Sequence, residues 1–240
     1  MSVAGFLRRW HRRLALVVGI QLLLWTASGL VFTLRPIEEI RGEHLLLPES
    51  PPPAALLPAE AAPLEILAAG GSLQGEWRLA WRRGRWLWIP GDGGPPRDAR
   101  SGRLLPPLER SEAEALARSR IRGAGAVSSS TLLEASPARG EYRGGAVPAW
   151  RVELEGPEGA RVYLDAWTGE VRSVRTDGWR LFDFFWGLHI LDWRDREDFH
   201  HPLLIAAVIL GVLSSLTGLG LGLWILRGSL AARRRRRRRT

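Results

Sequence analysis

Two long uncharged apolar segments constrain the fold of this chain most. Residues 14–34 (LALVVGIQLLLWTASGLVFTL) and residues 203–226 (LLIAAVILGVLSSLTGLGLGLWIL) contain no charged side chain. An apolar α-helix of about 20 residues spans the hydrocarbon of a bilayer, so both segments are predicted to be transmembrane helices. A cleaved signal peptide is the alternative for the first segment. Its apolar core is longer than the roughly 7–15 residues of such signals, and no clear A-x-A cleavage site follows.

The positive charge of the chain lies at its two ends. The formal net charge is +9, yet the twelve arginines before residue 14 and after residue 226 are accompanied by no acid. Residues 35–202 hold 22 arginines against 25 carboxylates. The positive-inside rule then predicts that both termini are cytoplasmic and that residues 35–202 lie across the membrane. We expect this membrane to be a bacterial inner membrane, with residues 35–202 in the periplasm. The basic ends are expected to contact the lipid bilayer at anionic headgroups, and nucleic acid is not an expected partner.

The middle of the chain is predicted to contain two similar units. Each has a short helical pattern followed by strands of alternating polarity, with hairpin turns at Arg83-Gly84 and at residues 156–159 (GPEG). Residues 59–69 form the first helical pattern, and a capping box at Ser111-Glu112 begins the second. The predicted order is a cytoplasmic N-terminus (1–13), transmembrane helix 1 (14–34), a proline-rich linker (35–58), the first unit (59–110), the second unit (111–176), an interfacial amphipathic segment (177–202), transmembrane helix 2 (203–226) and an arginine-rich cytoplasmic tail (227–240).

A turn motif recurs at the end of both units. The pattern D-A-x-[ST]-G-x-[LV] begins at Asp98 and again at Asp165, an offset of 67 residues, which predicts an internal repeat. Each carboxylate is expected to cap its turn, and Gly102 and Gly169 are expected to adopt the left-handed conformation. Neither aspartate has a histidine, lysine or second carboxylate at a repeated spacing. We therefore predict no catalytic residue and favour a non-enzymatic protein.

The second copy of the motif carries a resemblance to a known family. Residues 162–171 (VYLDAWTGEV), which follow a helix and antiparallel strands, resemble a PepSY domain. Residues 9–12 (RWHR), 187–192 (GLHILD) and 216–218 (LTG) are similar to the membrane flanks of short, two-helix PepSY-associated membrane proteins. The resemblance implies an α+β membrane protein in which two transmembrane helices flank an extracytoplasmic PepSY-like antiparallel β/α region, arranged as a diverged tandem. It also implies either peptidase binding or inhibition, or, as in larger four-helix relatives that reduce ferric siderophores, haem held between histidines.

The histidines lie too far apart to hold one haem within a single chain. His11 is at the predicted cytoplasmic edge, whereas His189, His200 and His201 are at the outer edge, about 30 Å away across the hydrocarbon. No metal site is expected either, because a helix over residues 187–199 would separate His189 from His200 by about 16 Å. The favoured interpretation is an aromatic interfacial collar that leads into a helix starting at Pro202. His11, His189 and His201 remain candidate haem ligands only if a partner chain completes the site.

Small and polar residues inside the apolar segments predict helix packing. They are Gly19, Gln21, Ser28, Gly29, Ser214, Gly218 and Gly222. They can serve packing within one chain, a homodimer, or contact with another membrane protein. The leading functional hypothesis is a membrane-anchored PepSY-type binding module that recognises a protein or peptide partner, for example by strand addition to its tryptophan- and arginine-rich sheet. No cofactor is predicted in that case; the alternative is a haem-binding electron-transfer component linked to iron or siderophore reduction.

Overall fold

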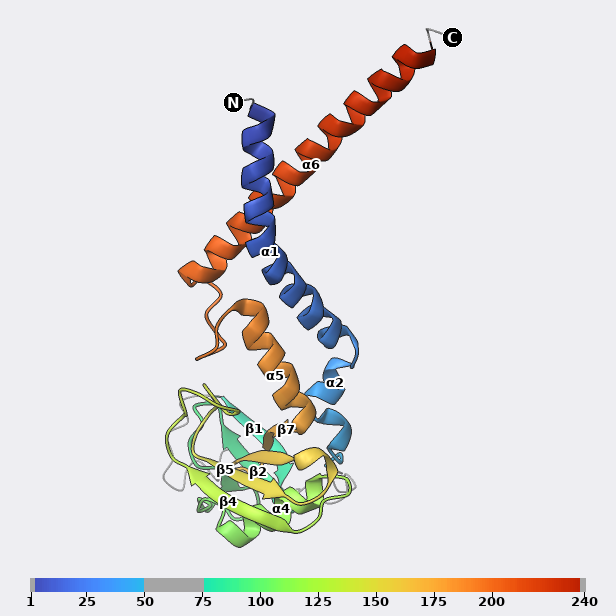
Figure 1. Ribbon diagram of the computed structural model, residues 1–240. Coiled ribbons are helices and arrows are strands. Elements are labelled where there is room, and N and C mark those ends of the chain that lie inside the picture. The colour runs from blue at the N-terminus through green and yellow to red at the C-terminus, as the bar shows by residue number, and fades with distance from the viewer. Residues whose placement is uncertain (1–2, 50–75, 238–240) are drawn as a thin grey trace. The chain divides into compact units, whose positions relative to one another are not determined.

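The computed structural model describes residues 3–49 and 76–237 (Figure 1). The chain divides into two compact units. The first, called here the helical unit, contains the residues up to 34 and those from 182 onward; the second, the sheet unit, contains residues 35–181. Helix α5 (Asp177–Ile190) begins in the sheet unit and ends in the helical unit.

The helical unit is built on two long helices, α1 (Val3–Thr33) and α6 (Pro202–Arg237). Their apolar parts, Arg8–Thr33 and Pro202–Ala231, have mean hydropathies of 2.0 and 2.2 and are long enough to cross a membrane. Only 11% of each apolar window is buried, so neither resembles the core helix of a soluble protein. The predicted pair of spanning helices is confirmed at this level, and the helix start at Pro202 is also confirmed.

Helices α1 and α6 cross and contact each other (Figure 1). Val18 of α1 and Ser214 of α6 are both buried. Nearer the N-terminus of α1, His11 Nδ1 lies 3.0 Å from the hydroxyl of Thr217. The contact therefore combines close packing with a polar pair.

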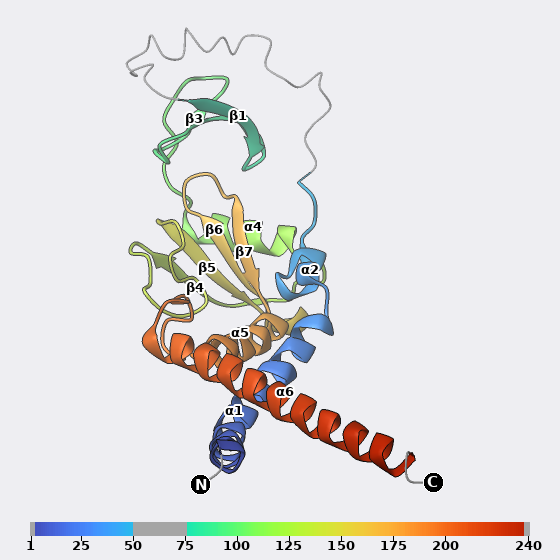
Figure 2. The same ribbon diagram turned by 90° about the horizontal axis from the view of Figure 1, so that it is seen from above.

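The larger sheet of the sheet unit is antiparallel, with its four strands in chain order (Figure 2). Its strands are β4 (Val127–Leu133), β5 (Ala149–Leu154), β6 (Arg161–Asp165) and β7 (Val171–Arg175). Helix α4 (Arg110–Arg120) packs on β4, β5 and β6. The predicted 156–159 turn joins β5 to β6 and contains a short 3₁₀ helix, η3 (Pro157–Gly159).

The core of the larger sheet lies beneath α4. Ala113 and Ala117 of α4 are fully buried in one cluster with Val152, Val162 and Leu164, and the last two face this cluster from alternate positions of β6. The predicted capping box is displaced by two residues. The side chain of Glu112 accepts a 2.9 Å bond from the backbone N–H of Glu109, so the cap is Glu109 and Ser111 lies inside the first turn.

The smaller sheet contains β1 (Trp77–Arg82), β2 (Arg85–Pro90) and β3 (Arg97–Asp98). The predicted hairpin turn at Arg83-Gly84 is confirmed, with φ of +54° and +70°. Ala80, Leu87 and Ile89 form its buried cluster. The helical pattern predicted for residues 59–69 lies outside the described residues.

The two sheets share the same strand register around their D-A turns. In the smaller sheet Leu87 pairs with Asp98, and in the larger one Ala149 pairs with Asp165. The next residue along each strand is a tryptophan, Trp88 in one case and Trp150 in the other. The two D-A turns therefore follow strands that pair in the same register with their neighbours.

Residues 35–49, predicted to be part of a linker, pack on the sheet unit instead. They form α2 (Ile37–Ile40) and a 3₁₀ helix, η1 (Glu43–Leu45). Leu45 joins the core beneath α4, and the backbone N–H of Leu47 donates a 2.8 Å bond to the carbonyl of Arg120. The linker prediction failed for these residues because it rested on composition. Composition identifies a proline-rich stretch but does not show which of its apolar residues are buried.

Candidate functional site

The two repeated turns have the same hydrogen bonds. Oδ1 of Asp98 accepts bonds from the N–H of Arg100 (3.0 Å) and from the N–H and hydroxyl of Ser101 (2.9 and 3.0 Å). Oδ1 of Asp165 accepts bonds from the N–H of Trp167 (2.9 Å) and from the N–H and hydroxyl of Thr168 (2.7 and 3.0 Å). Each carboxylate thus satisfies the backbone of its own turn.

The second turn is the more tightly held of the two. Oδ2 of Asp165 accepts a 2.9 Å bond from Arg172. Burial opposes ionisation of Asp165, but the bonds from Thr168 and Arg172 outweigh it and lower the pKa of the carboxyl. Gly169 has a φ of +72°, and a Cβ there would approach Leu116 of α4 to 2.5 Å. A lowered pKa and a full set of donors suit a structural carboxylate, not a proton donor at neutral pH.

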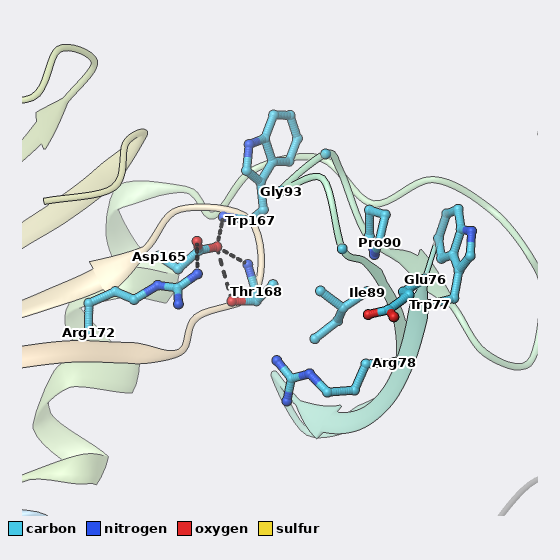
Figure 3. A pocket seen from close by; sticks show the side chains of 12 residues that line it. Glu76, Trp77, Arg78, Ile89, Pro90, Gly93, Asp165, Trp167, Thr168 and Arg172 are labelled. Atoms are coloured by element: carbon cyan, nitrogen blue, oxygen red, sulfur yellow. Dashed lines mark hydrogen bonds and ion pairs between the residues drawn. The ribbon is translucent and has the colours of Figure 1, made fainter. Parts of the chain in front are cut away.

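A pocket of about 580 Å³ lies between this turn and the smaller sheet (Figure 3). Arg78 and Ile89 point into it from the smaller sheet, and Asp165, Thr168 and Arg172 line the opposite side. The guanidinium of Arg78 is more than half exposed and reaches its carboxylate partner, Glu170, only at 3.9 Å. The pocket can therefore offer a cation and apolar surface to a bound group.

The outer edge of β4 is the second candidate surface of the sheet unit. β4 pairs with β5 on one side, and no described strand pairs with its other side. Its sequence, VSSSTLL, contains neither charge nor proline, and Ser128, Ser129, Thr131 and Leu132 are exposed. A bulge between Val127 and Ser129 disturbs only its first residues. Edge strands usually carry charges or prolines, or are covered by another element, and these features prevent pairing with another chain. After the bulge, β4 carries neither a charge nor a proline.

His189 lies against α1. Its Nδ1 is 2.7 Å from the hydroxyl of Ser28, and its backbone carbonyl accepts a 2.7 Å bond from the indole of Trp25. The Ser28 hydroxyl already donates to a helix carbonyl, so the histidine is assigned as the Nδ1–H donor, which leaves Nε2 as an acceptor. Burial lowers the pKa of His189. Neutral His189 therefore presents Nε2 without a hydrogen bond to any described residue.

His11 has the same arrangement at the other end of α1. Thr217 donates its hydroxyl to the carbonyl of Leu213, so His11 donates through Nδ1–H and Nε2 is the acceptor. His201 differs, because its Nε2 bonds to the carbonyl of Ile190 (2.8 Å) and its Nδ1 accepts the N–H of Leu204 (3.3 Å). Both ring nitrogens of His201 are therefore engaged, Nδ1 in capping α6 and Nε2 in a bond to the last residue of α5, whereas His11 and His189 each have one nitrogen without a bond to a described residue.

The segment after α5 is not helical, contrary to a continuous helix over residues 187–199. α5 ends at Ile190, and Asp192 accepts bonds from the backbone N–H groups of the loop that follows, at residues 194, 195, 197 and 198. Burial opposes ionisation, but these bonds lower the pKa of Asp192 to about 2. The guanidinium of Arg196 pairs with the buried carboxylate of Asp183. Across the described residues, no three histidine, aspartate or glutamate side chains are grouped to bind a metal ion.

Only some of the predicted packing residues lie at the α1–α6 contact. Ser214 is buried there, and a Cβ at Gly218 would approach the His11 ring to 2.8 Å. Ser28 is fully buried, but it contacts α5. Gly19, Gly29 and Gly222 face open space, because a Cβ on any of them would meet nothing within 4 Å. Gln21 has a buried amide nitrogen without a partner among the described residues.

Sequence reasoning did not identify Trp25 and Thr217 as partners of the histidine-containing segments. Their signal was present, since a hydroxyl or an indole N–H inside an apolar helix needs an acceptor or donor nearby. Pairing them with His189 and His11 required the tertiary arrangement.

The profile of the PepSY-associated TM region family matches residues 8–240. The chain belongs to this family. The match covers nearly the whole chain, so it includes both long helices as well as the sheet unit. No curated protein and no solved structure matches the chain.

Proposed function

We propose that this PepSY-associated protein is a membrane-anchored binding module whose sheet unit faces the periplasm and recognises an extended segment of a protein or peptide partner. The observation that carries this proposal is the open, uncharged edge of β4. Of the five regularly paired residues, Ser129 to Leu133, alternate ones (Ser130 and Leu132) direct their backbone N–H and C=O groups away from β5, where no described strand pairs with them. An extended peptide can add to such an edge through main-chain hydrogen bonds, while exposed side chains select its sequence.

Charge and burial at β4 support a peptide over a second helix as the occupant. Ser129 and Thr131 alternate with Ser130, which is buried and bonds to Glu114 of α4. One face of the strand is thus taken by α4, and only the edge and the opposite polar face are open. A helix needs a continuous apolar groove, which β4 does not offer. The pocket beside Arg78 supplies a separate contact area with cationic and apolar character.

A photo-crosslinking experiment in cells tests this function. A benzophenone amino acid at Thr131 on β4 is expected to trap a partner, and the same group at the exposed Arg118 on α4 serves as the matched control. Leu132→Pro, which removes an N–H on the outer edge, should abolish the Thr131 adduct. With the partner identified by mass spectrometry, hydrogen exchange at the outward N–H groups of Ser130 and Leu132 in the full-length protein should slow on binding. A partner trapped equally from Arg118, or unchanged exchange in β4, would contradict strand addition.

A haem-binding electron-transfer role is the second candidate, because His11 and His189 share one arrangement. Each donates Nδ1–H to a hydroxyl that is itself bonded to its helix, which fixes the ring and leaves Nε2 for a ligand. These two residues are the candidate axial ligands, because each has a ring nitrogen without a hydrogen bond to a described residue; His201 is not, since both of its nitrogens are engaged. Haem would supply one-electron chemistry, and the protein would hold the iron and set its electrostatic surroundings.

The two histidines cannot share one haem within the chain. His11 and Ser28, the partner of His189, are 17 positions apart on α1, which is about 25 Å at helical rise. Each would require a histidine from another chain. An absorption spectrum of protein expressed with ample haem separates the two candidates: a Soret band that shifts on reduction and disappears in His11→Ala or His189→Ala supports the haem role, and a colourless protein excludes it.

A further inference from the structure

The contacts of the helical unit reveal an offset between its two apolar segments. At one end, the guanidinium of Arg8 lies 5.5 Å from the ring of Trp224, and His11 contacts Thr217. At the other end, Ser28 of α1 contacts the ring of His189. The carbonyl of the next residue, Ile190, contacts the ring of His201, which lies just before α6. The start of α6 is therefore level with Ser28 of α1, and not with Leu34, where the apolar segment of α1 ends.

The offset means that one bilayer cannot cover both apolar segments fully. Hydrocarbon placed over residues 14–34 would leave the part of α6 beyond Thr217 outside it. Hydrocarbon placed over residues 203–226 would instead leave the last turn and a half of α1 outside. Between Arg8 and Ser28 the axial length of α1 is about 30 Å, and between Leu203 and Trp224 that of α6 is about 31 Å. Both lengths match a hydrocarbon core of about 30 Å.

The cost of exposure favours a bilayer that follows α6. Beyond Thr217, five large apolar side chains are at least half exposed: Leu219, Leu223, Trp224, Ile225 and Leu226. Each would cost up to about 1.5–3 kcal/mol if left in water. Beyond Ser28 only Leu30 and Leu34 are comparably exposed. Phe32 is sheltered, because its ring lies 4.7 Å from that of Phe182 and 6.1 Å from that of Trp186.

A bilayer that follows α6 has one unfavourable consequence, because it places arginines of α1 inside the hydrocarbon. Arg12 and Arg13 would lie up to five residues, or about 7.5 Å, inside the cytoplasmic boundary. A long arginine side chain can reach back to the headgroups over such a distance. This cost is smaller than that of exposing a whole apolar helix end.

We propose that the outer hydrocarbon boundary lies at Ser28 and Pro202, and that an aromatic rim formed by Phe184, Trp193 and Phe199 contacts phospholipid of the outer leaflet. Each of the three rings is about half exposed, at 52, 54 and 49%. Leu203, the first large apolar residue of α6, follows Phe199 by four positions and is 57% exposed. Aromatic side chains favour the headgroup level, where their rings meet both lipid and water.

The loop that carries Trp193 and Phe199 can approach headgroups because several of its backbone polar groups are satisfied internally. Four of its backbone N–H groups donate to Asp192, and the indole N–H of Trp186 donates to the carbonyl of Arg196 at 3.1 Å. Arg196 in turn pairs with Asp183. Trp193 and Phe199 are thereby presented outward from a braced loop. The rim does not depend on whether β4 binds a peptide.

Depth measurements on spin-labelled protein test the proposal. The chain has no cysteine, so single-cysteine variants of the full-length protein can be labelled uniquely in phosphatidylethanolamine/phosphatidylglycerol vesicles. Leu223→Cys and Leu34→Cys give opposite expectations. The proposed boundary places the label at position 223 in hydrocarbon, where collisions with oxygen should be severalfold more frequent than collisions with a water-soluble nickel complex. It places the label at position 34 outside the hydrocarbon, where the nickel complex has access. The reversed pattern would overturn the boundary.

Labels on the rim test lipid contact separately. Trp193→Cys and Phe199→Cys should show collision ratios between those of a buried-depth control, Leu213→Cys, and an aqueous control, Ser128→Cys. A ratio at Trp193 equal to that at Ser128 would overturn the lipid contact. Spin–spin broadening at Trp193 that disappears on dilution with unlabelled protein would also overturn it, by assigning the rim to a second copy of the chain.

Discussion

Replacing Asp165 with alanine removes the acceptor at the centre of the second turn. The N–H and hydroxyl of Thr168 both donate to Asp165, and Thr168 is only 4% exposed, so water cannot easily replace the carboxylate. A buried donor left unsatisfied costs about 1–3 kcal/mol. Arg172 keeps Glu170 as a partner at 3.3 Å, so the lost ion pair adds little. We expect a total loss of about 2–4 kcal/mol in the free energy of unfolding of the sheet unit.

The first turn supplies a matched control. Asp98→Ala removes the same three bonds, but Ser101 is exposed and water can satisfy it. The expected cost is therefore only about 1 kcal/mol. Urea titration of the full-length protein in detergent, with pulse proteolysis to follow cleavage of the sheet unit, measures both variants. Equal losses for the two variants, or a larger loss for Asp98→Ala, would refute the explanation based on burial.

The pH dependence gives a second measurement of the same turn. The folded pKa of Asp165 lies below the ordinary value of 3.8, so its contribution is fully present above that value and is lost as the pH falls through the folded pKa. The stability difference between the wild-type protein and Asp165→Asn should therefore begin to shrink as the pH falls below 3.8 and should vanish below the folded pKa. A stability difference that persists undiminished to the lowest measurable pH would show that the charge of Asp165 is not the cause.

Three further predictions concern the core of the sheet unit and the α1–α5 contact. Gly169→Ala combines a strained positive φ with a clash against Leu116, so urea titration should show a loss of about 2–4 kcal/mol in the free energy of unfolding. Gly84→Ala, where the added Cβ meets open space, should lose only about 1 kcal/mol. Trp150→Phe removes a buried 2.9 Å bond to a backbone carbonyl and should cost about 1–3 kcal/mol in the same assay; a loss near zero would show that the carbonyl finds another donor. Burial lowers the pKa of His189 below 6.5, so its contact with α1 should weaken as the pH falls through 6.5. Imidazole ¹⁵N NMR should show the Nδ1–H tautomer and a titration midpoint below pH 6.5. A higher titration midpoint would contradict the burial of the ring.

Local patterns in the sequence were sufficient for the elements whose physics is local. The uncharged segments predicted the apolar parts of α1 and α6, because a helix that crosses lipid must be apolar over about 20 residues. Period-2 alternation and turn residues predicted the β1–β2 and β5–β6 hairpins. These signals depend on neighbours along the chain and need no knowledge of the final packing.

The same patterns failed where burial depends on distant residues. Residues 35–49 were predicted to be part of a proline-rich linker, yet Leu45 completes the core beneath α4. The capping residue of α4 was misplaced because several polar residues near Glu109 can serve as caps, and only the backbone geometry selects one. In the candidate haem site, sequence spacing separated His11 from His189 but could not show that each ring donates to a hydroxyl on a long helix.

The sequence by itself determined that this chain has two lipid-compatible helices around a mixed α/β region, and that each repeated turn carries an aspartate to cap it. Tertiary structure alone decided which level of α1 faces which level of α6, and that α5 shelters Phe32 and binds His189 to Ser28. The physical reason is that hydropathy and turn geometry are properties of consecutive residues. The offset of two packed helices follows instead from which side chains fit and pair across them, and a linear pattern does not record this.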